Sequence, residues 1–235
     1  MIIIPDIHGR VFWKDAVKDK NEKVIFLGDY VDPYPGEKLS LTGAIDNLEE
    51  IIEYKKSNPD QVILLLGNHD FMYMDYEHNR YSCRHDFGNE PKITKILLNS
   101  RGQFQMAYTT KINGKDYVFS HAGILSDWLE EHKDLFGEHK SIPEYVKTIN
   151  NLYHEWNPKF IQSLLEISSY RGGWSDFGSM IWADLREHRF SEDKNVYQIF
   201  GHTQLKDQPI ISENFADLDC RRSFVLNEKT GEIEV

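Results

Sequence analysis

Five short apolar runs, each followed at once by polar residues, constrain the fold of this chain most strongly. The runs are Met1–Ile4, Lys23–Leu27, Gln61–Leu66, Tyr117–Phe119 and Val196–Phe200. Near-continuous hydrophobic runs bounded by Gly, Asn and Asp are typical of strands that are buried on both faces. Helical patterns lie between several of these runs. The alternation of strand and helix therefore predicts an α/β protein with a substantially parallel sheet and right-handed crossovers.

The helical patterns have recognisable beginnings. Ser40 is predicted to cap a helix that ends at Asn58-Pro59. Its apolar stripe consists of Leu41, Ile45, Leu48, Ile51 and Ile52. Residues 126–168 are also predicted to be mainly helical, and Ser141-Ile142-Pro143-Glu144 has the spacing of a capping box. We interpret this stretch as a helical insertion within a single domain that covers residues 1–235.

Two segments indicate antiparallel pairing. Phe104–Ile112 and Lys115–Phe119 are separated by Asn113-Gly114, and this dipeptide favours a tight hairpin because both residues tolerate positive φ. The tail from Ile210 onward alternates short strand-like runs with turns. It predicts a second, antiparallel layer.

Composition excludes several classes of partner. The chain has 235 residues with 27 Lys and Arg against 38 Asp and Glu, a formal charge of −11. An acidic balance argues against broad nucleic-acid binding and against docking on anionic membranes. Cys83 and Cys220 have no metal or redox spacing and are predicted to be reduced thiols. No apolar run approaches the ~20 residues that span a bilayer, and the N-terminus lacks the basic region of a signal peptide. We expect a cytoplasmic protein, and the sequence leaves its oligomeric state open.

A polar motif follows each of the five predicted strands. The motifs are Asp6-Ile7-His8-Gly9-Arg10, Gly28-Asp29-Tyr30-Val31-Asp32-Pro33, Gly67-Asn68-His69-Asp70, Ser120-His121-Ala122-Gly123 and Gly201-His202-Thr203. In open α/β sheets, ligands bind outside the carboxyl ends of the strands. The five motifs are therefore predicted to converge on one crevice.

The residue types in these motifs favour a metal centre. Asp, His and Asn provide oxygen and nitrogen ligands without thiolate, which suits Mn²⁺, Fe or Zn²⁺. The candidate ligands in the five motifs are too many for one tetrahedral ion. Their number is about right for two ions that share a bridging carboxylate. Two ions ~3.5–4 Å apart can hold a hydroxide between them and polarise a phosphoryl group for in-line attack. Asp29 and Asp32 alone could be turn residues, and His121 or His202 alone could be structural. The conjunction of all five motifs favours the metal site.

The remaining histidines lie in no ligand spacing. They are His78, His85, His132, His139, His154 and His188. We expect them to be surface or packing residues.

The five motifs resemble those of the calcineurin-like metallophosphoesterase superfamily. The resemblance runs from Asp6 to about Thr203 and is strongest to the branch of serine/threonine protein phosphatases and diadenosine tetraphosphatases. It implies a four-layer αββα fold with two central mixed sheets, a dinuclear metal site and hydrolysis of phosphate esters. Gly201-His202-Thr203-Gln204 lacks the second His of many superfamily phosphodiesterases and nucleases, which favours the phosphatase branch.

The resemblance also implies a role for each motif residue. Asp6 and His8 would bind the first metal ion, Asp29 would bridge both ions, and Asn68, His121 and His202 would bind the second. His69 would be the general acid that protonates the leaving oxygen, and Asp32 would orient its imidazole. A leaving alkoxide needs a proton, and His is the usual donor near neutral pH.

Two positions depart from the phosphatase pattern. Pro33 stands where that branch usually has an Arg that clamps a phosphate oxygen, and Asp70 stands where Glu is usual. Arg10 and Arg171 are the candidates to replace the clamp.

The sequence therefore leaves three functions open. The first is a metal-dependent phosphatase of monoesters in small molecules, nucleotides or phosphoproteins. The second is a phosphodiesterase or dinucleoside polyphosphate hydrolase that uses the same site. The third is a non-catalytic metal-binding scaffold.

Overall fold

The structure is a computed structural model, and it describes residues 1–18, 21–75, 84–138, 141–188 and 196–234. Its strands are β1 (Ile2–Ile4), β2 (Val24–Phe26), β3 (Val62–Leu65), β4 (Phe104–Gln105), β5 (Ala107–Ile112), β6 (Lys115–Ser120), β7 (Val196–Phe200), β8 (Ile210–Ile211), β9 (Phe215–Asp217), β10 (Phe224–Leu226) and β11 (Ile233–Glu234). Its α-helices are α1 (Phe12–Val17), α2 (Leu41–Ser57), α3 (Asn68–Met74), α4 (Glu90–Asn99), α5 (Ser126–Glu131), α6 (Lys133–Phe136), α7 (Ile142–His154), α8 (Pro158–Leu164) and α9 (Leu185–His188).

The strands form two mixed sheets. In the first, the order is β11-β10-β1-β2-β3-β4, with β1 to β4 parallel and β10 antiparallel to both β1 and β11. In the second, the order is β5-β6-β7-β9-β8, with β6, β7 and β9 parallel and the two edge strands antiparallel. All five predicted strands are present, as β1, β2, β3, β6 and β7.

Side chains of the central strands alternate between two apolar cores. Ile3 and Ile25 of the first sheet and Phe119 and Ile199 of the second belong to one core, which fills the space between the sheets. The neighbours of these residues along the strands, such as Ile4 and Val118, belong to a larger core that includes the helices. Successive side chains of a strand point to opposite faces of its sheet. One face of each sheet therefore packs against the other sheet, and the opposite face packs against helices.

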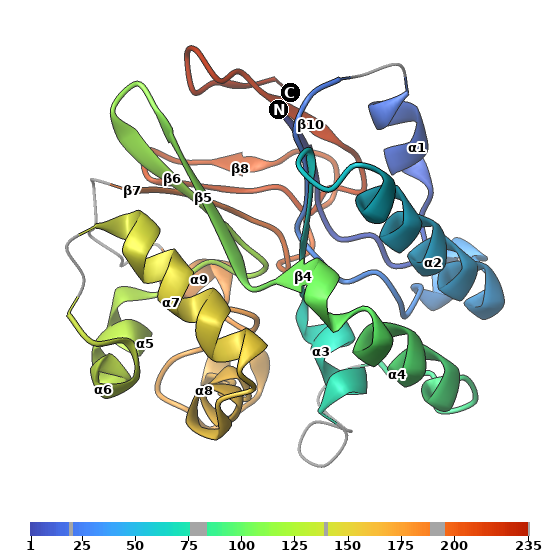
Figure 1. Ribbon diagram of the computed structural model, residues 1–235, viewed down its shortest axis with the longest axis horizontal. Helices are drawn as coiled ribbons and strands as arrows, with labels where there is room; N and C mark the ends of the chain where they lie inside the picture. The colour runs from blue at the N-terminus through green and yellow to red at the C-terminus, as the bar shows by residue number, and fades with distance from the viewer. Residues whose placement is uncertain (19–20, 76–83, 139–140, 189–195, 235) are drawn as a thin grey trace.

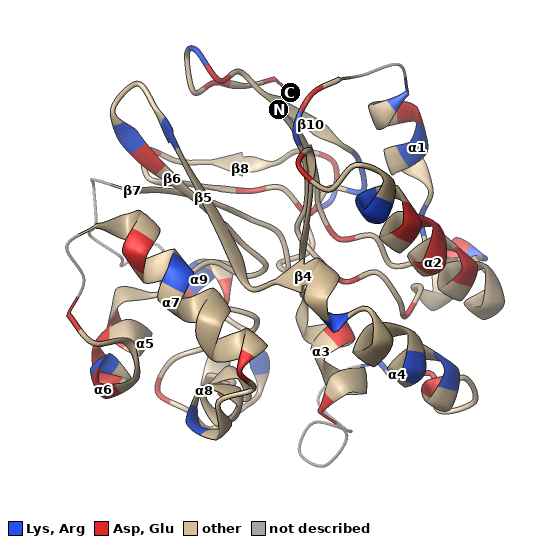
Figure 2. Cartoon of the chain, viewed as in Figure 1, with Lys and Arg blue, Asp and Glu red and all other residues tan. Residues whose placement is uncertain are grey.

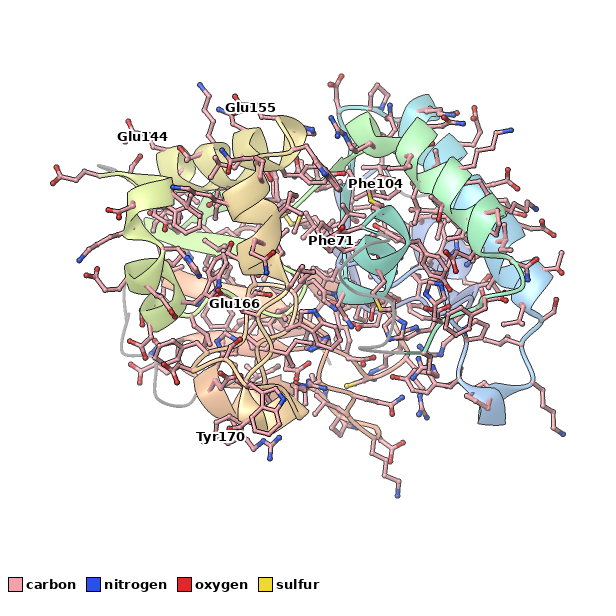
Figure 3. The ribbon with its side chains drawn as sticks, turned by 90° about the horizontal axis from the view of Figure 1, so that it is seen from below. Phe71, Phe104, Glu144, Glu155, Glu166 and Tyr170 are labelled. Carbon is pink, nitrogen blue, oxygen red and sulfur yellow. The ribbon has the colours of Figure 1, made fainter. Side chains whose placement is uncertain are left out.

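The helices cover the outer faces of the two sheets, which completes four layers. Figure 1 shows α1, α2 and α4 beside the first sheet and α5 to α8 beside the second. Phe71 of α3 and Phe104 of β4 are buried in the interior, whereas Glu144 and Glu155 lie at the outer surface (Figure 3). Acidic residues line the outer face of α2 (Figure 2). The predicted αββα architecture is confirmed.

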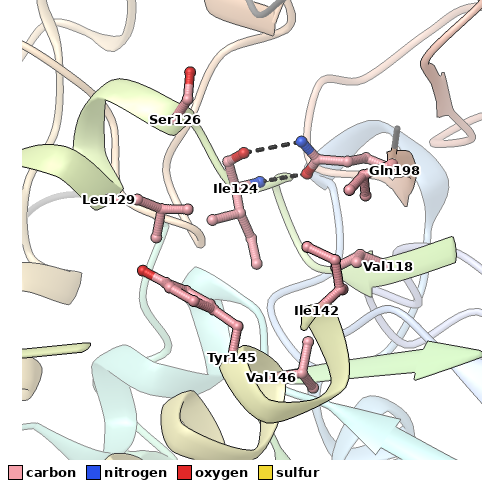
Figure 4. A pocket seen from close by; sticks show the side chains of 9 residues that line it. Val118, Ile124, Ser126, Leu129, Ile142, Tyr145, Val146 and Gln198 are labelled. Carbon is pink, nitrogen blue, oxygen red and sulfur yellow. Dashed lines mark hydrogen bonds between the residues drawn. The ribbon is translucent and has the colours of Figure 1, made fainter. Parts of the chain in front are cut away.

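An apolar pocket lies between the second sheet and helices α5 and α7 (Figure 4). At its edge, the side chain of Gln198 on β7 accepts a hydrogen bond from the backbone N–H of Ile124 and donates one to its carbonyl, at 2.7 and 2.9 Å. This pair of bonds fixes the loop that leaves β6, which is the loop that carries His121.

The predicted hairpin is correct at its turn and wrong in its first strand. Asn113 and Gly114 both have positive φ, and β5 pairs with β6 as expected. Phe104–Ile112, however, is two strands, because β4 joins the first sheet and β5 the second. The Asn150 side chain of α7 accepts hydrogen bonds from the backbone N–H groups of residues 106 and 107 at 2.9 and 3.1 Å, and so interrupts the ladder.

The tail does not form a separate antiparallel layer, which corrects that prediction. Strands β8 and β9 extend the second sheet, whereas β10 and β11 extend the first. The tail therefore pairs with edge strands that would otherwise leave backbone groups without partners.

Two local predictions about the helices differ from the structure. The Ser40 side chain caps α2 as expected, by accepting a hydrogen bond from the N–H of Gly43, but Leu41 is 47% exposed and lies outside the buried stripe. Ser141 precedes α7 but its side chain makes no capping hydrogen bond. Pro143 removes one of the N–H groups that such a cap would use.

Residues 126–168 contain α5 to α8, and their description as an insertion within one domain stays a prediction. Cys220 is buried as a free thiol, while Cys83 lies outside the described residues. Among the described helices, none is both long enough and apolar enough to span a bilayer.

Candidate active site

The predicted metal ligands lie in loops or at a helix start, at the carboxyl ends of strands from both sheets. Asp6 and His8 follow β1, and Asp29 follows β2. Asn68 begins α3 directly after β3, His121 follows β6 and His202 follows β7. All except His202, which is partly exposed, are buried. Two neighbouring sheets therefore supply one cluster of polar side chains.

The backbone at this cluster is held in an unusual conformation. His8, Asp29, Asp32 and His202 have φ values of 43°, 53°, 59° and 68°. Left-handed backbone costs a non-glycine residue roughly 1–2 kcal/mol, and Asp and His are among the residues that accept it most readily. The chain thus bends sharply after β1, β2 and β7.

Glycines beside these residues leave room for two carboxylates. A Cβ atom added at Gly67 would collide with the carboxylate of Asp29, and one added at Gly201 would collide with that of Asp6. Each glycine is therefore required by a close approach of side chain to backbone.

Asp29 lies between two groups of histidines. Its Oδ2 is 3.4 Å from Nε2 of His8, and its Oδ1 is 3.6 Å from Nε2 of His121. The first group of possible metal ligands consists of His8, Asp29 and His69, and the second consists of Asp29, His121 and His202. Asp29 is the residue shared by both groups, which is the arrangement that a bridging carboxylate needs.

Asn68 and Asp6 are attached to the second group. Oδ1 of Asn68 lies 3.0 Å from Nε2 of His121, and Nδ1 of His202 lies 3.1 Å from the same nitrogen. Both carboxylate oxygens of Asp6 accept a hydrogen bond from the backbone N–H of His202 at 3.1 Å. The structure thus brings all six predicted metal ligands together, and their roles as ligands stay predictions.

Hydrogen bonds fix the imidazole tautomers. Nδ1 of His8 lies 2.9 Å from the carbonyl oxygen of Val31, and Nδ1 of His121 lies 3.0 Å from that of Leu27. A carbonyl can only accept, so each Nδ1 carries the proton and each Nε2 presents a lone pair. Burial lowers the pKa of both imidazoles, which keeps them neutral.

This donor set fits divalent cations. Lone pairs of His8 and His121 converge with carboxylate and amide oxygens, and Nε2 of His202 is buried without a hydrogen-bond partner within the described chain. Burial, and then the nearby Asp6, raises the pKa of Asp29 well above its ordinary value. Cations bound between these groups would relieve the repulsion between the carboxylates of Asp29 and Asp6. They would also offset the hydration that these buried carboxylates lose.

His69 and Asp32 form a hydrogen-bonded pair beside the cluster. Nδ1 of His69 is 2.8 Å from Oδ2 of Asp32, whose Oδ1 accepts a 2.5 Å hydrogen bond from Tyr73. Burial raises the pKa of Asp32 to about 7, although the hydrogen bond from Tyr73 opposes this shift. Burial and the charge of Arg84 lower the pKa of His69. The His69 ring also makes an edge contact with that of His8, at 4.9 Å between centroids.

Asp70 connects two of the motif loops. Its Oδ2 accepts hydrogen bonds from the N–H groups of Asp29 and Gly67 at 2.7 and 3.0 Å, and its Oδ1 accepts one from the N–H of Tyr30. This carboxylate therefore holds the turn that carries Asp29 against the beginning of α3.

The two predicted phosphate-binding arginines are each paired with an acid. Arg10 makes a bidentate pair with Glu37, at 2.6 and 2.7 Å. Nε of Arg171 lies 2.9 Å from Oδ2 of Asp184, and its Nη2 donates to Thr203 at 2.6 Å. Arg171 borders the cluster through this contact with the loop of His202, while Arg10 is held by its own motif and Glu37.

Sequence patterns did not identify Tyr73 or Arg84 as residues that support the site, and they included Asp70 without assigning it a role. Tyr73 lies one helical turn after His69 on α3, so the spacing of the two could have identified it. Asp70 occupies the third position of the same helix, where an acid is typical of a capping box. Arg84, whose Nη2 donates to the carbonyl of Asp32 at 3.1 Å, has no such local signal.

The other described histidines are not among the proposed ligands. His188 donates from Nε2 to the carbonyl of Ala122, and the His85 ring stacks on that of Tyr73. His132, with Glu131 and Glu166, forms a separate and more exposed group. His78 and His139 lie outside the described residues.

The comparisons with known proteins identify the family. The Metallophos family, described as calcineurin-like phosphoesterase, matches residues 2–205 of the chain. The protein therefore belongs to the calcineurin-like phosphoesterase family, whose members are dinuclear, metal-dependent hydrolases of phosphate esters. No curated protein sequence matches the chain.

Solved structures share the fold at low sequence identity. A protein serine/threonine phosphatase from Saccharomyces cerevisiae, described as similar to human phosphatase PP5, aligns with a TM-score of 0.55 and 13% identity, over 99% of this chain and 78% of its own. A point mutant of a cold-active protein tyrosine phosphatase aligns with a TM-score of 0.53 and 16% identity, over 99% and 76%.

The pKa shifts predict how the stability of the metal-free protein depends on pH. Burial raises the pKa of Asp32 and of Asp70 to about 7. Burial, together with the nearby charge of Asp6, raises the pKa of Asp29 well above its ordinary value. The folded state then holds protons that the unfolded state has released. This stabilising difference disappears as the pH rises through the folded-state pKa values.

We therefore expect the free energy of unfolding to fall as the pH rises from about 6.5 through the folded-state pKa of about 7 that Asp32 and Asp70 share. Histidines with lowered pKa values act in the opposite direction, but only below their unfolded pKa of about 6.5. Urea denaturation in the presence of a chelator measures this directly. A free energy that stays constant or rises over this window would contradict the burial of these carboxylates.

Proposed function

We propose that this protein is a metal-dependent phosphatase that hydrolyses phosphate monoesters, in the manner of serine/threonine phosphatases. The observation that carries the proposal is the place of Asp29 between two imidazole groups, with the His69–Asp32 pair directly beside them. Family membership supports the reaction class, and the geometry supports Asp29 as the shared carboxylate and the His69–Asp32 pair as the acid.

The proposed metal ligands are those predicted from the sequence: Asp6 and His8 for one ion, Asn68, His121 and His202 for the other, and Asp29 for both. The oxygen and nitrogen donors suit Mn²⁺, with Fe and Zn²⁺ as alternatives. When bound, two such ions supply an activated water and polarise the phosphoryl group for in-line attack.

The His69–Asp32 pair would supply the proton for the leaving oxygen. With the pKa of Asp32 raised to about 7 by burial, the pair holds a proton near neutral pH. Nε2 of His69 can donate a proton to the leaving alkoxide while Nδ1 takes one from Asp32. Tyr73 holds the Asp32 carboxyl in place during this transfer.

The test of this proposal is steady-state hydrolysis of an aryl phosphate. We expect turnover that requires added Mn²⁺, stops with a chelator and returns when Mn²⁺ is restored. Activity of the metal-loaded protein no greater than that of a His69→Ala variant would overturn the proposal.

A second candidate is a phosphodiesterase or dinucleoside polyphosphate hydrolase. It is favoured by Pro33 and by the ion pairs that occupy Arg10 and Arg171, since a diester or an internal anhydride offers fewer terminal oxygens to clamp. Values of kcat/KM for an aryl phosphate, a bis-aryl phosphate and diadenosine tetraphosphate separate the two candidates. A clear preference for the monoester supports the phosphatase, and the reverse order supports the second candidate.

A further inference from the structure

The geometry points to Arg84 as the residue that binds the phosphate group of the substrate, with Tyr34 as its platform. This inference rests on the proposed function and names a binding residue that the motifs do not contain. Arg84 follows the segment after α3, and its guanidinium carbon lies 3.7 Å from the centroid of the Tyr34 ring. Its Nη2 donates to the backbone carbonyl of Asp32 at 3.1 Å.

These two contacts place Arg84 at the edge of the candidate metal centre. The Tyr34 ring makes an edge contact with the ring of His8, at 4.8 Å between centroids. The Asp32 side chain in turn bonds to Nδ1 of His69. One contact partner of Arg84 thus touches a proposed metal ligand, and the other holds the proposed acid.

Arg84 differs from the other two arginines in its charge balance. Arg10 is neutralised by a bidentate pair with Glu37, and Arg171 shares Asp184 with Arg186. Within the described part of the chain, no carboxylate lies at ion-pair distance from Arg84. Its Nε is buried and has no hydrogen-bond partner among the described residues. Among the described residues, therefore, no carboxylate neutralises the positive charge of Arg84, which can bind an anion.

The surroundings also hold the guanidinium plane before a ligand arrives. Stacking on an aromatic ring and one hydrogen bond to a carbonyl restrict a side chain that otherwise has many rotamers. A preorganised planar fork suits a phosphate dianion, which offers several terminal oxygens at once. A diester has fewer such oxygens and one less charge, so Arg84 should favour monoesters.

The test uses metal-loaded protein with the variants Arg84→Ala and Arg84→Lys. We expect Arg84→Ala to weaken binding of inorganic phosphate, and to raise KM for an aryl phosphate, by roughly 10- to 100-fold. KM for a bis-aryl phosphate should change by less than about threefold. Arg84→Lys keeps the charge but loses the planar fork, so it should recover only part of the binding.

The matched control is Arg101→Ala. Arg101 also lies over an aromatic ring, that of Trp156 at 5.3 Å, and also donates to a backbone carbonyl, that of His154 at 2.8 Å, but it is not part of the site. This variant should bind phosphate as the wild type does. Metal content and melting temperature are measured for every variant, so that loss of the fold is recognised. If Arg84→Ala does not fold, Arg84→Lys alone gives the result.

The possible outcomes separate this inference from the proposed function. Phosphate affinity of Arg84→Ala or Arg84→Lys within about twofold of the wild type, at full metal content, would overturn the role of Arg84 and leave the phosphatase proposal standing. A wild-type protein that binds phosphate through Arg84 but hydrolyses no ester would overturn the proposed function and support the binding residue.

Discussion

A His69→Ala variant is expected to hydrolyse an aryl phosphate with a kcat roughly 10²- to 10⁴-fold lower than that of the wild type. The imidazole is held by a 2.8 Å contact between its Nδ1 and Asp32, and it lies in edge contact with His8. These contacts orient it as a proton donor beside the proposed metal centre. Its loss should be most severe for alkyl phosphates, because an alkoxide is a poorer leaving group than a phenolate.

Two measurements on the His69→Ala variant distinguish a general acid from a metal ligand: the dependence of the rate on the leaving group, and the number of bound metal ions. His69 belongs to the first group of possible ligands, so its removal could also release an ion. A variant that keeps two ions and shows a steeper dependence of rate on leaving-group pKa supports the acid role. Loss of an ion with unchanged dependence would contradict it. His154→Ala, an exposed histidine of α7, is the matched control.

An Asp29→Asn variant is expected to lose at least one of two bound ions and to lower kcat by roughly 10³-fold or more, since the attacking water depends on both ions. The Asn side chain keeps the oxygen that accepts a hydrogen bond from the N–H of His69, at 3.0 Å in the wild type. The fold should therefore survive while the charge of the proposed bridging carboxylate disappears.

Stability gives an independent readout of the same substitution. Burial and the nearby Asp6 raise the pKa of Asp29, so ionising this residue in the metal-free protein is unfavourable. Metal-free Asp29→Asn should be at least as stable as the metal-free wild type at about pH 8, and Mn²⁺ should raise its melting temperature less. Asp15→Asn, on the exposed face of α1, is the control. Full metal content in Asp29→Asn would show that Asp29 is not a bridge.

Features that depend on the order of residues along one strand were predictable from the sequence. Residues that directly follow a strand lie at the carboxyl end of that strand, independently of how distant segments pack. Asp6, Asp29 and His121 were therefore located by their position after β1, β2 and β6, and the structure gathers them as expected. The near-continuous apolar runs themselves predicted strands that are buried on both faces, whereas the division into two sheets followed from the family resemblance.

Features that depend on contacts between distant segments were not predictable in this way. The division of Phe104–Ile112 into β4 and β5 depends on Asn150, which is far away in the chain. The tail was expected to form its own layer, because its short runs do not reveal which edge strands they pair with. Arg84 reaches the site through stacking on Tyr34, and no spacing within a motif encodes such a contact.

The position of the candidate site at the junction of two sheets has a mechanical consequence. Asp29 and Asn68 move with the first sheet, whereas His121 and His202 move with the second. Ions bound by residues of both sheets would cross-link the two sheets. The apolar core between the sheets would then help to set how the ligands of the first sheet lie relative to those of the second. Altered packing at Ile25 or Ile199 would thus shift the proposed ligands relative to one another and lower the rate of hydrolysis, although neither residue is itself a proposed ligand.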